Sequence, residues 1–123
     1  METAGMTVRV DAAGNLIGRY AGAEELGQAA LATGSHIDTV PVGGKYDGCL
    51  GVIAGIELVQ TLKDHNLRLH HPIEVIVFSD EERSVIGCKA MSGGIVDSKK
   101  TPKSEIELAE KLKQEYFDGK DEK

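Results

Sequence analysis

Five residues in the sequence have side chains that could support metal chemistry. His36 and Asp38 stand two apart, Asp47 follows a glycine-rich stretch, and Glu81 and Glu82 are adjacent. Imidazole and carboxylate groups are metal ligands, and Asp47 could bridge two ions. A bound ion lowers the pKa of water and polarises a carbonyl group, while a neighbouring carboxylate accepts the released proton. These residue types therefore indicate metal-dependent hydrolysis.

The spacing of these residues suggests how each could be used. In an extended segment His36 and Asp38 project to one side, so Asp38 can hold the imidazole in one tautomer. Adjacent Glu81 and Glu82 would point to opposite sides, one toward metal and the other toward water. The alternative is that the histidine lies in a plain turn and the acidic run is a solvated loop or a helix N-terminus. Both interpretations stay open at this point.

The predicted elements would bring these residues to one edge of a sheet. Residues 29–33 are a continuously apolar run typical of a buried strand, and residues 73–78 are rich in β-branched side chains, as in an interior strand. Between them, apolar residues recur at helical spacing and predict a helix over residues 48–63. This order is a βαβ unit, whose strand exits face the same crevice. Upstream, residues 6–10 and 15–19 predict a hairpin or two consecutive strands.

Composition limits the classes of protein to which the chain could belong. The 123 residues, of which 41% are hydrophobic, allow one folded domain. The net charge of −6 without a basic stripe argues against a nucleic-acid partner. No apolar run is long enough for a membrane span, and the first residues are unlike a signal peptide, so we expect a cytoplasmic protein with no membrane partner. Cys49 and Cys88 are expected to be free, semi-buried thiols.

Three segments of the chain resemble one known family. They are Gly-Ser-His-Ile-Asp-Thr-Val at 34–40, Gly-Gly-Lys-Tyr-Asp-Gly at 43–48 and Phe-Ser-Asp-Glu-Glu at 78–82. Together they resemble the M20-type metallopeptidase/amidohydrolase family, in the branch of allantoate amidohydrolases and N-carbamoyl-L-amino acid hydrolases, the hydantoinase/carbamoylase group. The segments 11–16 and 51–57 are also similar to family segments, so the resemblance covers about residues 4–93.

The resemblance implies a role for each candidate residue. His36 would be a terminal metal ligand, Asp47 the carboxylate that bridges two divalent ions, and Glu82 a ligand of the second ion. Glu81 would be the general base that activates the attacking water, with Asp38 supporting His36. The ions would be zinc or manganese, with cobalt or nickel as further options. The substrate would be a small ureido or carbamoyl compound that releases ammonia.

The same resemblance implies a partial α/β domain. Residues 1–97 would form part of a three-layer α/β catalytic domain with a mixed, mainly parallel sheet. The lid domain and two further histidine ligands of the family have no counterpart in the sequence. Residues 98–123 predict a charged amphipathic helix and tail. The segment after Glu82 is about five residues shorter than the family pattern, which could distort the loop that carries the acidic pair.

Three functional hypotheses follow. The first is a truncated amidohydrolase acting on ureido or N-carbamoyl compounds, with weak or no activity alone. The second is a non-catalytic α/β fragment that self-associates, for instance as a homodimer, or binds a full-length relative. The third is a peptidase of the same family.

Overall fold

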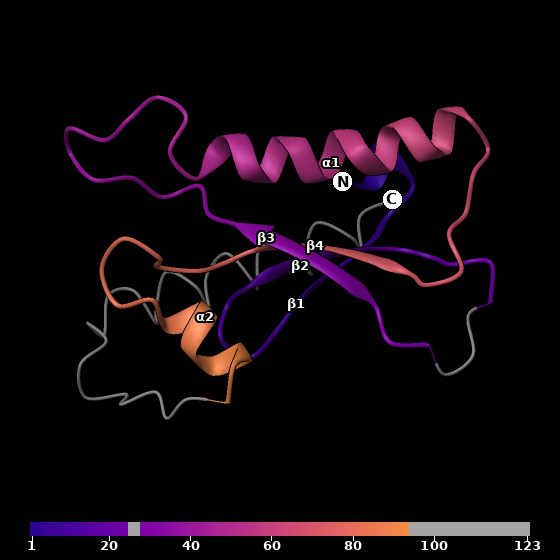
Figure 1. Cartoon of the computed structure of the whole chain (residues 1–123). Coiled ribbons are helices and arrows are strands. Elements are labelled where there is room, and N and C mark those ends of the chain that lie inside the picture. The colour runs from indigo at the N-terminus through magenta and orange to yellow at the C-terminus, as the bar shows by residue number, and fades with distance from the viewer. Residues whose placement is uncertain (25–27, 94–123) are drawn as a thin grey trace, which may run out of the picture.

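The structure, a computed structural model, describes residues 1–24 and 28–93. The described residues form four strands, two α-helices and a short 3-10 helix (Figure 1). In chain order the elements are η1 (Glu2–Ala4), β1 (Thr7–Val10), β2 (Leu16–Tyr20), β3 (Leu31–Ser35), α1 (Cys49–Asp64), β4 (Ile73–Val77) and α2 (Ile86–Met91). The predicted hairpin, helix and interior strand are confirmed to within two residues at each end.

The four strands form one mixed sheet in the order β1-β2-β4-β3. β1 pairs antiparallel with β2, and β2 pairs antiparallel with β4. β3 and β4 pair in parallel, from Leu31 opposite Ile73 to Ser35 opposite Val77. The α/β class and the mixed sheet are confirmed, although only one of these pairings is parallel. That parallel pair is the one the βαβ pattern predicts, because the crossover helix returns the chain to the same end of the sheet.

Helix α1 covers one face of the sheet and closes the core (Figure 1). Its buried residues, Val52, Gly55 and Val59, lie three or four apart and so share one face. A Cβ atom at Gly55 would lie 2.9 Å from Val75 Cγ1, so glycine allows the helix to approach β4 closely. Val59 and Val75 are fully buried in the core. The packing of α1 on β4 therefore fixes the β3-α1-β4 unit that carries the candidate site.

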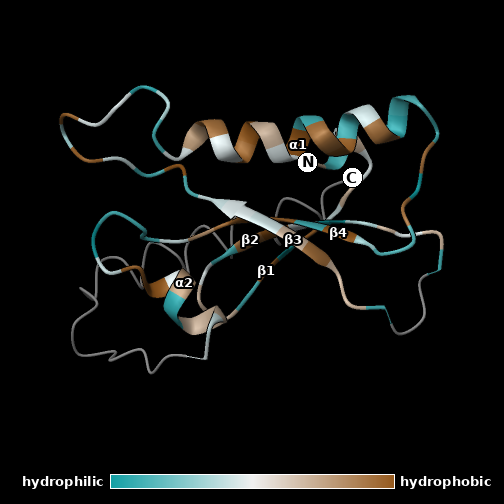
Figure 2. Ribbon diagram, viewed as in Figure 1, coloured by the Kyte–Doolittle hydropathy of each residue, from teal (hydrophilic) through white to brown (hydrophobic). Residues whose placement is uncertain are grey.

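The prediction that the first strand of the βαβ unit is buried is wrong for the described residues. Strand β3 begins two residues later than predicted, at Leu31, and four of its five residues are exposed. It is an edge strand. Among the described residues it pairs only with β4, so no strand lies along its other side. Figure 2 shows that its later residues are pale, close to neutral in hydropathy. The apolar run correctly indicated a strand and missed its position at the edge.

Some sequence predictions concern parts of the chain outside the described residues. The boundary near residue 97 and the charged helix and tail over 98–123 lie there. Within the described ranges, no helix is both long and apolar enough to cross a membrane. Cys49 and Cys88 are free, as predicted, but both are exposed and not semi-buried as expected.

Candidate metal centre

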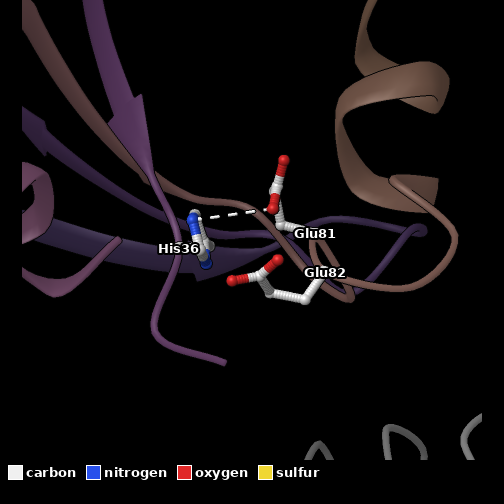
Figure 3. A group of neighbouring side chains, drawn as sticks. All are labelled: His36, Glu81 and Glu82. Atoms are coloured by element: carbon white, nitrogen blue, oxygen red, sulfur yellow. Dashed lines mark ion pairs between the residues drawn. The ribbon is translucent and has the colours of Figure 1, made fainter. Parts of the chain in front are cut away.

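The candidate site lies at the carboxyl ends of β3 and β4. His36 directly follows β3, and Glu81 and Glu82 follow β4 after a short connection. The parallel pairing continues past the strands, since the Phe78 N–H donates to the Ser35 carbonyl at 2.8 Å. Both strands therefore end at the same level, and the side chains that follow them meet. Figure 3 shows His36, Glu81 and Glu82 directed toward one another.

His36 is a buried imidazole, 8% exposed, with a defined tautomer. Its Nδ1 lies 3.0 Å from the Asp38 carbonyl oxygen, which can only accept, so Nδ1 carries the proton. Nε2 is then left with its lone pair, the form in which histidine binds metals. Gly48 packs against the ring: it has φ +72°, and a Cβ there would lie 2.6 Å from the imidazole. The loop before α1 thus closes on His36 only because residue 48 is glycine.

Two carboxylates face the free nitrogen of His36. Nε2 lies 3.6 Å from Glu81 Oε2 and 3.7 Å from Asp47 Oδ1. Both distances are too long for a hydrogen bond. They are close to the roughly 3.3 Å that separates two donors of one ion bound through ~2.0 Å bonds at a tetrahedral angle. The spacing therefore suits a shared cation better than direct contact.

Glu81 and Glu82 both reach the site, contrary to the expectation that they point to opposite sides. Ligand atoms of His36, Glu81 and Glu82 all lie within 4.8 Å of one another. The expectation assumed an extended segment, whereas residues 81–84 form a turn after Asp80, which has φ +48°. In a turn, consecutive side chains no longer alternate between two faces.

Glu82 supplies the observation that tests whether a cation fits. Its Oε1 is buried and has no hydrogen-bond partner among the described residues. A buried carboxylate oxygen without a partner is costly, because it has lost the water that would solvate its charge. A divalent cation beside His36 Nε2 would provide the missing partner. The residues present therefore fit the group that their chemistry suggests.

Asp38 connects the two strand ends. Its carboxylate Oδ2 accepts a hydrogen bond from the Glu82 N–H at 3.0 Å, while its carbonyl accepts from His36. Oδ1 also lies 3.5 Å from His36 Nδ1. The sequence predicted support for His36 alone. The structure shows that the same residue also holds the backbone of Glu82.

The local charge changes the acid-base behaviour of His36, whose pKa lies above its ordinary value of 6.5. Burial is the largest single influence and acts in the opposite direction, because it disfavours the charged imidazolium. The hydrogen bond to the Asp38 carbonyl and the negative charges of Glu81, Asp38 and Glu82 together outweigh burial. The site is therefore a region of negative potential that attracts cations.

Asp47 is less tightly assembled than the other four residues. Its side chain is 54% exposed, and it is not part of the compact group formed by His36, Glu81 and Glu82. It lies at the end of the exposed loop before α1, where its N–H donates to the Gly44 carbonyl. The structure thus brings Asp47 near His36 Nε2 without enclosing it.

Sequence reasoning missed the importance of Asn15. It was assigned to the turn before the second strand and to the start of that strand, yet it is fully buried and hydrogen-bonded to Ser79, after β4, and to Gly87, at the start of α2. The available signal was an asparagine at a strand start, where a polar side chain either faces solvent or needs buried partners.

An α/β domain with a histidine and carboxylates at adjacent strand ends defines a class, that of metal-dependent hydrolases with a site at the edge of the sheet. Comparison with known proteins gives the family. The model of Peptidase family M20/M25/M40 matches residues 32–117, and the chain belongs to this family. Its enzymes are metal-dependent.

Curated relatives place the chain near one branch of the family. It is 46% identical over 125 residues to an N-carbamoyl-L-amino acid amidohydrolase of Geobacillus stearothermophilus, which covers 96% of this chain and 30% of the relative. It is 40% identical to a ureidoglycolate hydrolase (97% and 24%) and 42% identical to an allantoate deiminase (99% and 25%), both of Arabidopsis thaliana. The chain thus spans about a quarter to a third of the length of these relatives.

Solved structures agree with this placement. A hydantoinase/carbamoylase family amidase from Burkholderia ambifaria has a TM-score of 0.63 at 47% identity, over 66% of this chain and 20% of that chain. AtUAH in complex with (S)-hydroxyglycine has a TM-score of 0.66 at 35% identity, over 89% of this chain and 29% of that chain. The family resemblance inferred from the three motifs is confirmed.

Proposed function

We propose that this chain is part of a metal-dependent amidohydrolase that cleaves C–N bonds of ureido or N-carbamoyl compounds, such as allantoate, ureidoglycolate or N-carbamoyl-L-amino acids. The observation that carries the proposal is the group of His36, Glu81 and Glu82, whose ligand atoms lie within 4.8 Å of one another. The buried, unpartnered Glu82 Oε1 supports a cation at this position. The names of the relatives support the substrate class.

In this proposal His36, Asp47 and Glu82 would hold two divalent ions, with Asp47 shared between them and Glu82 on the second ion. The ions would be zinc or manganese, with cobalt or nickel as alternatives. The ions would supply Lewis acidity toward the substrate carbonyl and lower the pKa of water. Asp38 keeps the proton on His36 Nδ1, so that Nε2 keeps its lone pair for a metal ion. It also fixes the backbone at Glu82.

Glu81 is the proposed general base. Its Oε2 lies 3.6 Å from His36 Nε2, so its carboxylate borders the place where a reacting water would lie. Glu81 takes a proton from this water as the oxygen adds to the carbonyl carbon, and it passes the proton to the nitrogen when the C–N bond breaks. For a ureido or carbamoyl substrate the nitrogen leaves as ammonia, and a carbamoyl substrate also releases its carbonyl carbon as carbon dioxide.

We also propose how the chain is organised and where it acts. Residues 1–97 belong to the catalytic domain and residues 98–123 form a charged extension. The substrate is a small molecule, the setting is the cytoplasm, and neither nucleic acid nor membrane is a partner. The chain carries a partial ligand set, so metal binding is weak and activity alone is low.

A second candidate is a non-catalytic fragment that self-associates or binds a full-length relative. Two observations favour it. Strand β3 has one edge unpaired among the described residues, and an exposed parallel edge invites pairing with another chain. Leu50 and Ile53 on α1 are 55% and 62% exposed, which leaves apolar surface open to a partner. A homodimer would cover such surface, and its test is the molar mass in solution by light scattering.

The experiment that tests the proposed site is calorimetric titration of the metal-free chain with zinc and with manganese. The chain is compared with Asp47→Asn and with the matched control Asp64→Asn, which removes the same charge at an exposed position at the end of α1. Binding that is lost in Asp47→Asn and retained in Asp64→Asn supports the site. No binding to the unmodified chain contradicts a metal site in these residues.

Substrate assays then separate the candidate activities. Ammonia release from allantoate or N-carbamoyl amino acids supports the amidohydrolase, whereas cleavage of dipeptides without ammonia release supports an M20-type peptidase. Metal binding without either activity favours the non-catalytic fragment.

A further inference from the structure

Asn15 is a polar side chain with no exposed surface that lies outside the candidate metal centre. It lies immediately before β2, the second strand of the hairpin. Its partners are far away in the sequence, at residues 79 and 87, and they flank the turn that carries Glu81 and Glu82. Because this buried amide connects two distant segments, it restrains the position of both.

Each polar atom of the Asn15 side chain is used. Nδ2 donates to Asp11 Oδ2 at 2.9 Å and to the Gly87 carbonyl at 3.1 Å. Oδ1 accepts from the Ser79 N–H at 3.0 Å. The amide donors and the carbonyl acceptor are thus all satisfied. Their partners are Asp11, in the turn before β2, and Ser79 and Gly87, at the two ends of the loop after β4. Asp11 in turn orients Asn15, because its Oδ1 accepts from the Asn15 N–H at 2.9 Å.

The two ends of the loop are also held close together. The Gly87 N–H donates to the Ser79 carbonyl at 3.2 Å, and Ser79 Oγ donates to the Ala13 carbonyl at 2.6 Å. A Cβ atom at Gly87 would lie 2.0 Å from Asn15 Oδ1. Glycine is therefore needed at position 87 for the loop to reach this amide.

Within the loop two residues adopt unfavourable backbone conformations, although the Ser84 and Val85 N–H groups donate to the Asp80 carbonyl. Asp80 and Val85 both have positive φ, +48° and +50°, which is unfavourable for side chains other than glycine and especially for a β-branched one. Such residues persist where surrounding contacts determine the backbone. Here the described contacts at the two ends converge on Asn15.

We propose that Asn15 is a positioning residue that fixes the loop 79–87, so that Glu81 and Glu82 face His36. The role in metal binding rests on the function proposed above. The positioning itself concerns the chain without metal. Asn15 clamps the ends of the loop, and Asp38 holds its middle through the Glu82 N–H.

Two measurements on the 123-residue chain test this inference. The first is amide hydrogen exchange in the metal-free protein, followed at Ser79 and Glu82. The second is zinc affinity by calorimetry. The variants are Asn15→Ala, Asn15→Asp, which keeps the volume but removes the amide donors, and Gly87→Ala, which leaves Asn15 intact and displaces it by contact. Val59→Ala is the control, because it destabilises the core of α1 away from this loop.

We expect exchange at Glu82 to accelerate at least tenfold in the Asn15 and Gly87 variants and zinc affinity to fall by 10–100-fold, the range typical of residues that orient ligands. Val59→Ala lowers the stability of the whole fold. It should change amide exchange at Glu82 and zinc affinity no more than this loss of stability requires. The response at Glu82 is decisive, since Asn15 does not touch it.

Three results would overturn the inference or separate it from the proposed function. Faster exchange at Ser79 alone, with Glu82 and zinc affinity unchanged, would show a local structural role only. If these variants do not fold, the variant Ser79→Ala takes their place. It removes the hydroxyl bonds to the Ala13 carbonyl and to Asn15 Oδ1 and leaves the Ser79 N–H bond to Asn15 intact. It must show a smaller change in the same direction, and no change contradicts the inference. Absence of zinc binding in the unmodified chain would refute the proposed function, and the exchange at Glu82 would still decide the positioning role.

Discussion

The carboxylate of Asp38 accepts a hydrogen bond from the backbone N–H of Glu82 at 3.0 Å. Asp38 follows β3 and Glu82 follows β4, so one side chain connects the two strand ends that form the candidate site. Its carbonyl also accepts from His36 Nδ1. Asp38 therefore helps to position two candidate metal ligands, the imidazole of His36 and the carboxylate of Glu82.

This connection predicts unequal effects of two substitutions. Asp38→Ala removes the acceptor for the Glu82 N–H, and we expect zinc affinity to fall about 10–100-fold. Asp38→Asn should cost less, because its amide oxygen can still accept the bond. Calorimetric titration of the unmodified chain and the two variants measures the order of their zinc affinities. Equal affinity of Asp38→Ala and the unmodified chain would contradict the role of Asp38 in positioning Glu82.

Glu81 is predicted to matter for turnover more than for folding. Glu81→Gln removes the proton acceptor, so ammonia release from a carbamoyl or ureido substrate should fall by about 10²–10⁴-fold. The far-ultraviolet circular dichroism spectrum should remain unchanged. Glu57→Gln, on the exposed side of α1, is the matched control and should retain the turnover of the unmodified chain. Unchanged turnover in Glu81→Gln would remove this residue from the mechanism.

The raised pKa of His36 gives a pH dependence for the metal-free chain. Because the folded chain binds this proton more tightly than the unfolded chain, the stabilisation is fully present below the ordinary pKa of 6.5. It is lost as the pH rises through the folded pKa. Titration of the His36 ring signals by NMR should show a midpoint above 6.5, and Glu81→Gln should lower it. A midpoint at or below 6.5 would contradict the negative environment of the ring.

Two glycines of the loop before α1 should respond differently to the same substitution. Gly48 has φ +72°, and its Cβ would lie 2.6 Å from the His36 ring, so Gly48→Ala should lower the free energy of unfolding by about 1–3 kcal/mol. At Gly44 the nearest atom to a Cβ is Asp47 Cβ at an ordinary 3.8 Å. Gly44→Ala should therefore stay within about 0.5 kcal/mol. Urea denaturation measures both, and equal effects would show that Gly48 does not constrain the site.

The local elements could be predicted because their signals are local. Helical spacing of apolar residues located α1, and β-branched residues located β4, since each pattern reflects one element packing against one layer. The burial of β3 could not be predicted in the same way. Its exposure depends on what lies beyond the sheet edge, which residues 31–35 do not encode.

The sequence by itself determined which residues could bind a cation and that His36, Glu81 and Glu82 follow neighbouring strands. It also determined the family, because the motifs and their spacing are linear features. Only the tertiary structure decided that both glutamates face His36, since a turn replaces the extended segment that the spacing suggested. Only the tertiary structure brought Asn15 to the loop after β4 and Asp38 to the N–H of Glu82. The physical reason is that hydrogen bonds between residues 44 or 64 positions apart depend on how the strands pair, and strand pairing is set by the packing of the whole domain.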